Sequence, residues 1–255
     1  MGIKGYSNIK KIMEAGTADI YIVVKKNVEY ILKITKAPYN FNNKLILNEY
    51  DFFQKFDIKH TPTIIEKINI DDRIGLIMTR LKGLSLQYLV EYGYEFDDKE
   101  ILLILKQVSI IIKDLHKNKI IYRDLKPSNI IYDFKDKKIS ICDFGTVYFE
   151  TSILGNKPIG TIGFASPEQF ERTGLTEDVD IFAIGSLAVY LKTAGKNIYT
   201  VNKKIMMKKI KSKKLKNLIH CSTHNEIKNR YNSIEQLIID LETNHYDFKF
   251  NKIFG

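Results

Sequence analysis

Hydrophobic and polar positions alternate along the first part of the chain. Residues 9–34, IKKIMEAGTADIYIVVKKNVEYILKI, are rich in β-branched side chains and predict three strands, with breaks at residues 14–19 and near residues 26–27. Residues 44–56, KLILNEYDFFQKF, change to a helical period, and two further strands follow around the turn at residues 71–72. This part of the chain therefore predicts a small, mostly antiparallel sheet with one helix.

Long helical patterns occupy the rest of the chain, apart from one hairpin. Asp97 and Glu100 have the spacing of a capping box, with Asp in the role of Ser or Thr, and predict the start of a long helix. Residues 129–143 hold two short strand patterns that flank a polar turn. Residues 179–191, VDIFAIGSLAVYL, fall short of the ~18 apolar residues that cross a bilayer, which predicts a buried helix. The last helix is expected within residues 233–244.

The order of these patterns predicts an α+β fold with two lobes in a single domain, residues 1–255. We expect residues 1–80 to form the small antiparallel β lobe with its one helix, and residues 81–255 to form a larger, mainly helical lobe. The hydrophobic fraction of 44% is ample for a packed core. No internal repeat, low-complexity linker or second core is visible in the pattern.

The formal net charge of +10 is unevenly distributed. Residues 203–216, KKIMMKKIKSKKLK, contain eight lysines and predict an amphipathic helical segment, whose basic face either is simply solvated or docks an anionic partner. Because no aromatic residue interrupts the lysines, base stacking is unsupported and no nucleic acid partner is expected. Cys142 and Cys221 lack the C-x-x-C spacing of a zinc site. With no N-terminal signal pattern and no membrane span, the expected location is cytoplasmic.

Four polar side chains lie close together within residues 122–145, YRDLKPSNIIYDFKDKKISICDFG: Asp124, Lys126, Asn129 and Asp143. Transfer of a phosphoryl group from a nucleotide needs a cation for the phosphates, oxygen ligands for Mg²⁺, a group that orients the acceptor hydroxyl, and a cleft that excludes water. The chain offers a candidate for each requirement. Separate turns would explain either aspartate alone, but not the lysine and the asparagine at these positions as well.

The D-L-K-P-S-N sequence followed by D-F-G resembles the catalytic and magnesium loops of eukaryotic-type, or Hanks-type, protein serine/threonine kinases, with this chain as a compact single-domain member. The resemblance implies the two-lobed protein kinase fold. It also implies that Asp124 orients the acceptor hydroxyl and that Lys126 neutralises charge on the transferred group. The implied catalytic residues are Asp124, Lys126 and Asn129, and the implied ligands of Mg²⁺, or of Mn²⁺ in its place, are Asn129 and Asp143.

The remainder of the chain offers an ATP site in the order that the family has it. The strand EYILKI places Lys33 where the family pairs a lysine with the α- and β-phosphates, and Glu49 would be its ion-pair partner. Met78 resembles the residue behind the adenine pocket, and residues 79–81 resemble the connector between the lobes. The resemblance assigns these residues to the ATP site: Ile12, Ile20, Lys33, Glu49, Met78, Leu81 and Ile131.

Residues 160–170, GTIGFASPEQF, resemble the substrate-facing end of a kinase activation segment. S-P-E at residues 166–168 replaces the usual A-P-E, and Arg230 stands where the family has the partner of that glutamate. Arg123 stands where such kinases have an arginine that pairs with a phosphate on the segment, so autophosphorylation within residues 145–155 is expected. Thr161 also favours serine/threonine over tyrosine kinases. The resulting regulatory candidates are Arg123, Thr151, Ser152 and Thr161.

The glycine-rich loop of the family, G-x-G-x-x-G-x-V, is degenerate in this chain. The aligned stretch MEAGTADI has Met13, Ala15 and Ala18 at the three glycine positions, and Gly16 is its only glycine. Because a non-glycine residue at positive φ costs ~1–2 kcal/mol, we expect the loop to weaken nucleotide binding without abolishing it. Ile31 replaces the alanine that the family places against the adenine ring, which narrows that pocket.

Three functional hypotheses follow. The first is a serine/threonine protein kinase that transfers the γ-phosphate of ATP to protein hydroxyls. The second is a non-catalytic, pseudokinase-like module that binds nucleotide or serves as a scaffold, and the third is a small-molecule kinase. The degenerate loop favours the second, and residues 160–170 disfavour the third because they suit holding a polypeptide. The first is favoured by a complete set of functional residues: Lys33, Glu49, Asp124, Asn129 and Asp143.

Overall fold

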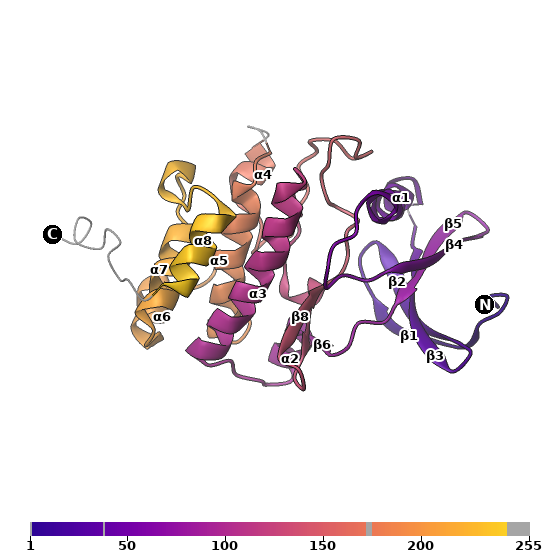
Figure 1. Cartoon of the computed structure of the whole chain (residues 1–255), viewed down its shortest axis with the longest axis horizontal. Helices are drawn as coiled ribbons and strands as arrows, with labels where there is room; N and C mark the ends of the chain where they lie inside the picture. Colours follow the sequence, from indigo (N-terminus) through magenta and orange to yellow (C-terminus); the bar gives the residue numbers. More distant parts are fainter. Residues whose placement is uncertain (1, 38, 172–174, 244–255) are drawn as a thin grey trace.

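The computed structural model describes residues 2–37, 39–171 and 175–243, which form two lobes (Figure 1). The small lobe is a five-stranded antiparallel sheet in the order β1-β2-β3-β5-β4, with α1 (Tyr39–Lys55) packed against it. Its strands are β1 (Ser7–Glu14), β2 (Ala18–Lys25), β3 (Val28–Thr35), β4 (Ile64–Ile70) and β5 (Arg73–Thr79). The predicted succession of three strands, one helix and two strands is confirmed.

Tight turns explain why these strands pair with their sequence neighbours. Lys26 and Asn27 both have positive φ, as a two-residue type I′ turn requires, and they join the paired residues Lys25 and Val28 of β2 and β3. Asp71 also has positive φ, in the short turn between β4 and β5. Asn and Asp tolerate this conformation better than other side chains, so the polar breaks in the hydrophobic pattern became turns.

Helix α1 begins at Tyr39 rather than at residue 44, where its hydrophobic period begins. The first turns carry asparagines that bind backbone carbonyls of the neighbouring strands and loops. Asn42 donates to the carbonyl of Lys36 at 2.8 Å, and Asn43 donates to that of Asp72 at 3.2 Å. These polar contacts hold the start of the helix, which a search for apolar periodicity does not detect.

The large lobe is built around α5 (Asp178–Lys192), a helix that is buried along nearly its whole length, as predicted. Both α3 (Asp98–Lys117) and α7 (Lys213–Ser222) pack on α5, and α8 (Ile234–Glu242) packs on α3. The smaller elements are β6 (Leu84–Ser85), α2 (Leu86–Glu91), η1 (Pro127–Asn129), β7 (Ile130–Asp133), β8 (Lys138–Ile141), α4 (Glu168–Glu171), α6 (Lys203–Lys209) and η2 (Ile227–Asn229). None of the helices within the described ranges is both long and apolar enough to cross a membrane.

Two details of the helices follow from single residues. The carboxylate of Asp97 accepts the backbone N–H of Glu100 at 2.8 Å, so the predicted cap of α3 is confirmed. Where α5 meets α7, a Cβ on Gly185 would lie 2.6 Å from Cβ of Ser222. Only glycine permits the two helices to approach this closely.

The lysine-rich segment is helical, as the pattern of residues 203–216 predicted, but it consists of two helices, α6 and α7, separated at residues 210–212. The backbone between the two helices is bound by a side chain from outside the segment. Asp98, at the start of α3, accepts the backbone N–H groups of Lys211 and Ser212, both at 2.8 Å, and Ser212 then caps α7. The hydrophobic period of a segment does not indicate that a carboxylate from another helix binds its backbone.

Candidate active site

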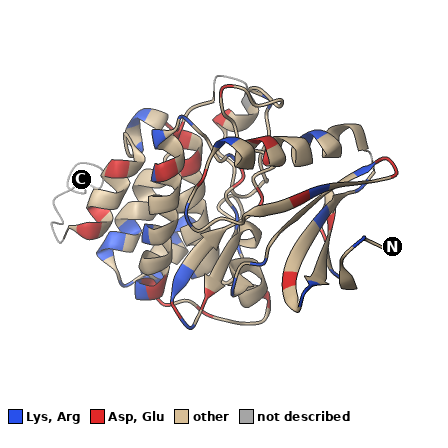
Figure 2. Ribbon diagram, turned by 45° about the vertical axis from the view of Figure 1, so that its right-hand side comes forward, with Lys and Arg blue, Asp and Glu red and all other residues tan. Residues whose placement is uncertain are grey.

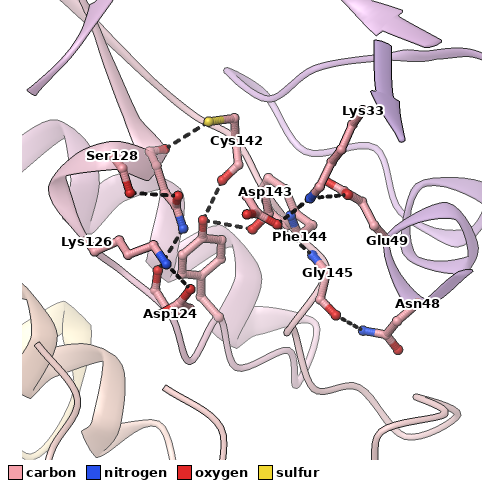
Figure 3. A network of polar contacts seen from close by, with 12 residues as sticks. Lys33, Asn48, Glu49, Asp124, Lys126, Ser128, Cys142, Asp143, Phe144 and Gly145 are labelled. Atoms are coloured by element: carbon pink, nitrogen blue, oxygen red, sulfur yellow. Dashed lines mark hydrogen bonds and ion pairs between the residues drawn. The ribbon is translucent and has the colours of Figure 1, made fainter. Parts of the chain in front are cut away.

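A buried cation lies between two carboxylates where the lobes meet. The Nζ atom of Lys33, on β3, is 2.7 Å from a carboxylate oxygen of Glu49, on α1, and 2.6 Å from one of Asp143, in the loop after β8 (Figure 3). Burial alone would lower the pKa of Lys33, but Asp143 and Glu49 outweigh it and hold that pKa above its ordinary value. The predicted pair of Lys33 and Glu49 therefore forms, and Asp143 joins it.

The loop that carries Asp143 is fastened to α1. The backbone N–H of Phe144 donates to the second carboxylate oxygen of Glu49 at 2.9 Å, and the Phe144 ring stacks on that of Phe52 with centroids 4.8 Å apart. Asp143 has a φ of 64°, a left-handed conformation that such contacts must hold. Its side chain is 38% exposed, whereas that of Glu49 is fully buried, so Asp143 keeps access to solvent.

Asp124, Lys126 and Thr161 form a second cluster. The Nζ atom of Lys126 is 2.7 Å from Asp124 and 3.0 Å from the hydroxyl of Thr161, and this hydroxyl donates to the other oxygen of Asp124 at 2.5 Å. The Nδ2 atom of Asn129, in η1, donates to the backbone carbonyl of Asp124 at 3.0 Å. Asp124, Lys126 and Asp143 lie in one region (Figure 3), and the hydrogen bond to Asp124 brings Asn129 into it, so the structure brings the predicted constellation together.

Two residues to which the sequence assigned no role support this region. The carboxylate of Asp180, on α5, accepts the backbone N–H groups of Tyr122 and Arg123 at 2.9 and 2.8 Å. The hydroxyl of Tyr122 lies 2.5 Å from the carbonyl of Cys142 and 3.0 Å from that of Asp143, and burial raises its pKa well above the ordinary value, so it remains a donor. Tyr122 therefore joins the two loops. The tyrosine directly before R-D was the only available signal in the sequence, and it does not reveal the contacts of the hydroxyl.

Asn129 and Asp143 present oxygen atoms of the kind that Mg²⁺ binds. The amide nitrogen of Asn129 donates to Asp124, and the amide oxygen, which accepts a hydrogen bond of 3.2 Å from the Ser128 hydroxyl, keeps a second lone pair that can face a metal. Burial raises the pKa of Asp143, but the charge and hydrogen bond of Lys33 lower it by more. The pKa of Asp143 therefore lies below its ordinary value, which favours the carboxylate. An amide oxygen and a carboxylate fit an ion that shares its remaining positions with water and phosphate.

The other residues assigned to ATP are distributed along the strands around this region. Met78 is buried on β5 and pairs in register with Ile31 of β3, in one apolar cluster. Ile20 pairs in register with Lys33 and is half-buried, whereas Ile12 is exposed. Leu81 and Ile131 are both half-buried. Their roles toward a nucleotide stay predictions.

The loop between β1 and β2 lacks the strain that the missing glycines predicted. The positive-φ residues of the described chain do not include Met13, Ala15, Gly16 or Ala18. The turn closes instead through a hydrogen bond of 2.9 Å from the N–H of Ala15 to the carbonyl of Ala18. Because the turn is short and its φ values are ordinary, non-glycine residues fit it without the expected cost.

The regulatory candidates occupy three different settings. Arg123 is 2% exposed and donates to the carbonyls of Gly155 and Lys157, and burial lowers its pKa to about 10. Thr151 is exposed and accepts a hydrogen bond from Lys55, whereas the Ser152 hydroxyl points to α1 and Thr161 belongs to the Asp124 cluster. The pairing of Arg123 with a phosphate stays a prediction.

The predicted ion pair between residues 168 and 230 is present. Arg230 contacts both carboxylate oxygens of Glu168, one of them at 2.9 Å, and both side chains are buried. Arg230 also donates to the backbone carbonyl of His224 at 2.8 Å, and its guanidinium lies over the ring of Phe182. The pair thus ties α4 to α5 and to the loop before α8.

A sheet lobe and a helical lobe that meet at a Lys-Glu-Asp assembly define the class of this protein. The chain belongs to the protein kinase domain family, whose model matches residues 2–248. It is 26% identical to the serine/threonine-protein kinase PrkC of Bacillus subtilis over 93% of this chain and 40% of that protein. It is 25% identical to the probable serine/threonine-protein kinase PknB of Lactococcus lactis, over 93% of this chain and 42% of that protein.

A third relative is the serine/threonine-protein kinase B of Synechocystis, 26% identical over 73% of this chain and 35% of that protein. The chain spans about two fifths of the length of the first two curated relatives. The family match supports one kinase domain, while the predicted boundaries at residues 1, 80 and 255 stay predictions, and residues 244–255 lie outside the described ranges.

Proposed function

We propose that the chain is a serine/threonine protein kinase that transfers the γ-phosphate of ATP to hydroxyl groups of a protein. The observation that carries this proposal is the position of the Lys33 ammonium, within 2.7 Å of the carboxylates of both Glu49 and Asp143. A lysine held in this way between two lobes is prepared to hold nucleotide phosphates beside a metal-binding carboxylate.

In this proposal each residue of the site has one role in phosphoryl transfer. Lys33 binds the α- and β-phosphates, and Glu49 orients Lys33. Asn129 and Asp143 hold the divalent cation, Mg²⁺ or Mn²⁺, which when bound neutralises phosphate charge. The proton of the acceptor hydroxyl passes to Asp124, whose oxygens retain free lone pairs beside their bonds with Lys126 and Thr161. Lys126 neutralises charge on the transferred group.

The adenine ring is proposed to lie between side chains of the two lobes. Ile12, Ile20 and Met78 would contact it from the sheet, Ile131 from β7, and Leu81 from the connector. Ile31 pairs with Met78 and is half-buried, which supports a narrow pocket. The turn between β1 and β2 has no positive φ at the positions of the missing glycines, so the expected strain does not count against nucleotide binding.

The test is transfer of label from γ-labelled ATP to generic protein substrates with Mg²⁺ or Mn²⁺, together with a thermal shift in the same buffers. We expect transfer, and a nucleotide at 100 times its Kd stabilises the folded protein by about 2.7 kcal/mol. Nucleotide stabilisation without transfer, beside an active control kinase, contradicts catalysis and supports the scaffold hypothesis. Transfer to an aminoglycoside or choline but to no protein supports the small-molecule hypothesis.

We further propose that the segment of residues 145–155 is an autophosphorylation target and that Thr151 is the main acceptor. Thr151 is exposed, and the ammonium of Lys55 is 2.5 Å from its hydroxyl oxygen, so a phosphate there meets a cation. Intact-mass analysis after incubation with ATP and Mg²⁺ is expected to show one added phosphate that the Thr151→Ala variant lacks. An unchanged mass in a preparation that phosphorylates added substrate contradicts this proposal.

The lysine surface, the side chains of the eight lysines within residues 203–216, is proposed to dock an acidic segment of the protein substrate. No ion pair joins these lysines to an acid within the described chain, and only Lys214 has a side-chain hydrogen bond, to the carbonyl of Leu241. Figure 2 shows Lys and Arg on α6 and α7 at the end of the helical lobe. Acidic substrates should therefore be preferred in the transfer assay, and less so at high salt. Cytoplasmic location stays a prediction.

A further inference from the structure

Asn48, the residue before Glu49 on α1, is fully buried and uses its whole amide group. Its nitrogen donates to the backbone carbonyl of Gly145 at 3.2 Å (Figure 3) and to that of Val147 at 2.9 Å. Its oxygen accepts a hydrogen bond of 2.8 Å from the hydroxyl of Ser152. One side chain thus holds three points of the segment that follows Asp143.

Two adjacent residues of α1 divide the support of this segment between them. Glu49 binds Lys33 and the N–H of Phe144, and Asn48 binds the residues that come next. Both side chains are shielded from water, so no solvent replaces a lost hydrogen bond. If Asn48 loses its contacts, the carbonyl of Gly145 loses its partner and the carbonyl of Val147 keeps only the hydroxyl of Ser152, so the segment is free to move Asp143.

Among the residues that the structure describes, the hydroxyl of Ser152 is the only hydrogen-bond partner of the Asn48 amide oxygen, and phosphorylation can remove this contact reversibly. Transfer of a phosphoryl group from a nucleoside triphosphate forms an Oγ–P bond, breaks the bond from that phosphorus to the nucleoside diphosphate, and releases the hydroxyl proton. The modified oxygen can no longer donate, and a dianion then faces the amide oxygen of Asn48 and the carbonyl of Val147, 3.2 Å from Oγ. Both of these groups are acceptors, and the backbone N–H of Leu154, a donor, lies farther from the Ser152 oxygen at 3.4 Å.

We infer that Asn48 is a positioning residue for Asp143 and that Ser152 is an inhibitory phosphorylation site that releases it. The inference rests on the proposed function. It gives neighbouring hydroxyls opposite effects, because a phosphate on Thr151 meets the cation of Lys55, whereas a phosphate on Ser152 meets oxygen atoms. Because Ser152 is half-buried, its hydroxyl accepts a phosphoryl group only when the segment opens. The phosphate then keeps the segment open.

The test compares Asn48→Ala, Ser152→Asp and Ser152→Ala with the wild type, in kcat, in KM for a protein substrate, and in amide hydrogen exchange of residues 144–152. We expect Asn48→Ala and Ser152→Asp to lower kcat about 10- to 100-fold with little change in KM, and to speed exchange about tenfold or more. Ser152→Ala should lose only severalfold, because Asn48 keeps its two carbonyl partners. Thr151→Asp should retain or gain activity.

The control for α1 is Asn40→Ala, an exposed residue of the same helix, which should leave rate and exchange unchanged. Wild-type kcat and exchange in both Asn48→Ala and Ser152→Asp overturn the inference, as does a loss in Thr151→Asp equal to that in Ser152→Asp. Should the wild type transfer no phosphate at all, the proposed function fails. Hydrogen exchange, which needs no catalysis, still decides whether Asn48 and Ser152 hold the segment.

Discussion

Replacing Asp124 with alanine is expected to lower kcat for phosphoryl transfer about 10²–10⁴-fold while nucleotide binding remains. Asp124 contacts Lys126 and Thr161, and none of its hydrogen bonds reaches the Lys33 assembly. The variant therefore loses the group that orients the acceptor hydroxyl but keeps the groups that hold phosphates. The measurement is initial rates with labelled ATP, beside a thermal shift with nucleotide and Mg²⁺.

Asp143→Asn separates the two halves of the site. The substitution removes a negative charge from Lys33 and weakens a proposed metal ligand, so we expect both transfer and the Mg²⁺-dependent part of the thermal shift to fall. Asp136→Asn, an exposed aspartate in the hairpin between β7 and β8, is the matched control and should behave like the wild type. Equal activity in all four proteins would mean a contaminating kinase and would remove support for catalysis by this chain.

The sheet and the main helices could be predicted because their signals are local. Alternation over residues 9–34 and the cap at Asp97 depend on neighbours in the chain, and both predictions are confirmed. The break between α6 and α7 could not be predicted in this way, because it depends on Asp98, more than 100 residues earlier. Lysines and apolar residues alone favour one continuous helix there.

In the candidate site too, local features could be predicted from the sequence and long-range contacts could not. Short motifs placed Asp124, Asn129 and Asp143, since their spacing is set by one loop and one hairpin. The supporting contacts of Asn48 and Tyr122 join segments distant in the sequence, and a polar residue on a buried helical face is ambiguous until its partner is known. The backbone strain expected from the missing glycines is absent for a related reason, because the motif carries an expected φ that this short turn does not adopt. The expected weakening of nucleotide binding stays a prediction.

A second large effect is expected at the buried pair of Arg230 and Glu168. Arg230→Ala should lower the free energy of unfolding by about 3–5 kcal/mol, because it leaves the carboxylate of Glu168 buried without its cation. For a chain of this size the melting temperature should fall by about 6–20 °C. Lys228→Ala removes an ion pair with Glu226 in which Lys228 is 79% exposed, and should cost less than about 1 kcal/mol.

The pH dependence of this loss shows whether the charge of Glu168 is its cause. Burial raises the pKa of Glu168 but Arg230 outweighs it, so the pKa lies below the ordinary value of 4.5. A carboxylate with a lowered pKa stabilises the folded protein above its unfolded pKa, and the contribution is lost as pH falls through the folded value. In Arg230→Ala the cation is gone and burial, the largest influence on this pKa, is opposed only by hydrogen bonds from Ser166 and the backbone. The pKa of Glu168 is then expected to rise, and its protonation favours folding. The difference in unfolding free energy between wild type and Arg230→Ala should therefore shrink below about pH 4.5.

A double variant, Glu168→Gln with Arg230→Met, should lose less stability than Arg230→Ala, because it leaves no buried charge without a partner. A difference that is constant from pH 7 to pH 4, with no recovery in the double variant, would assign the loss to packing against Phe182 instead.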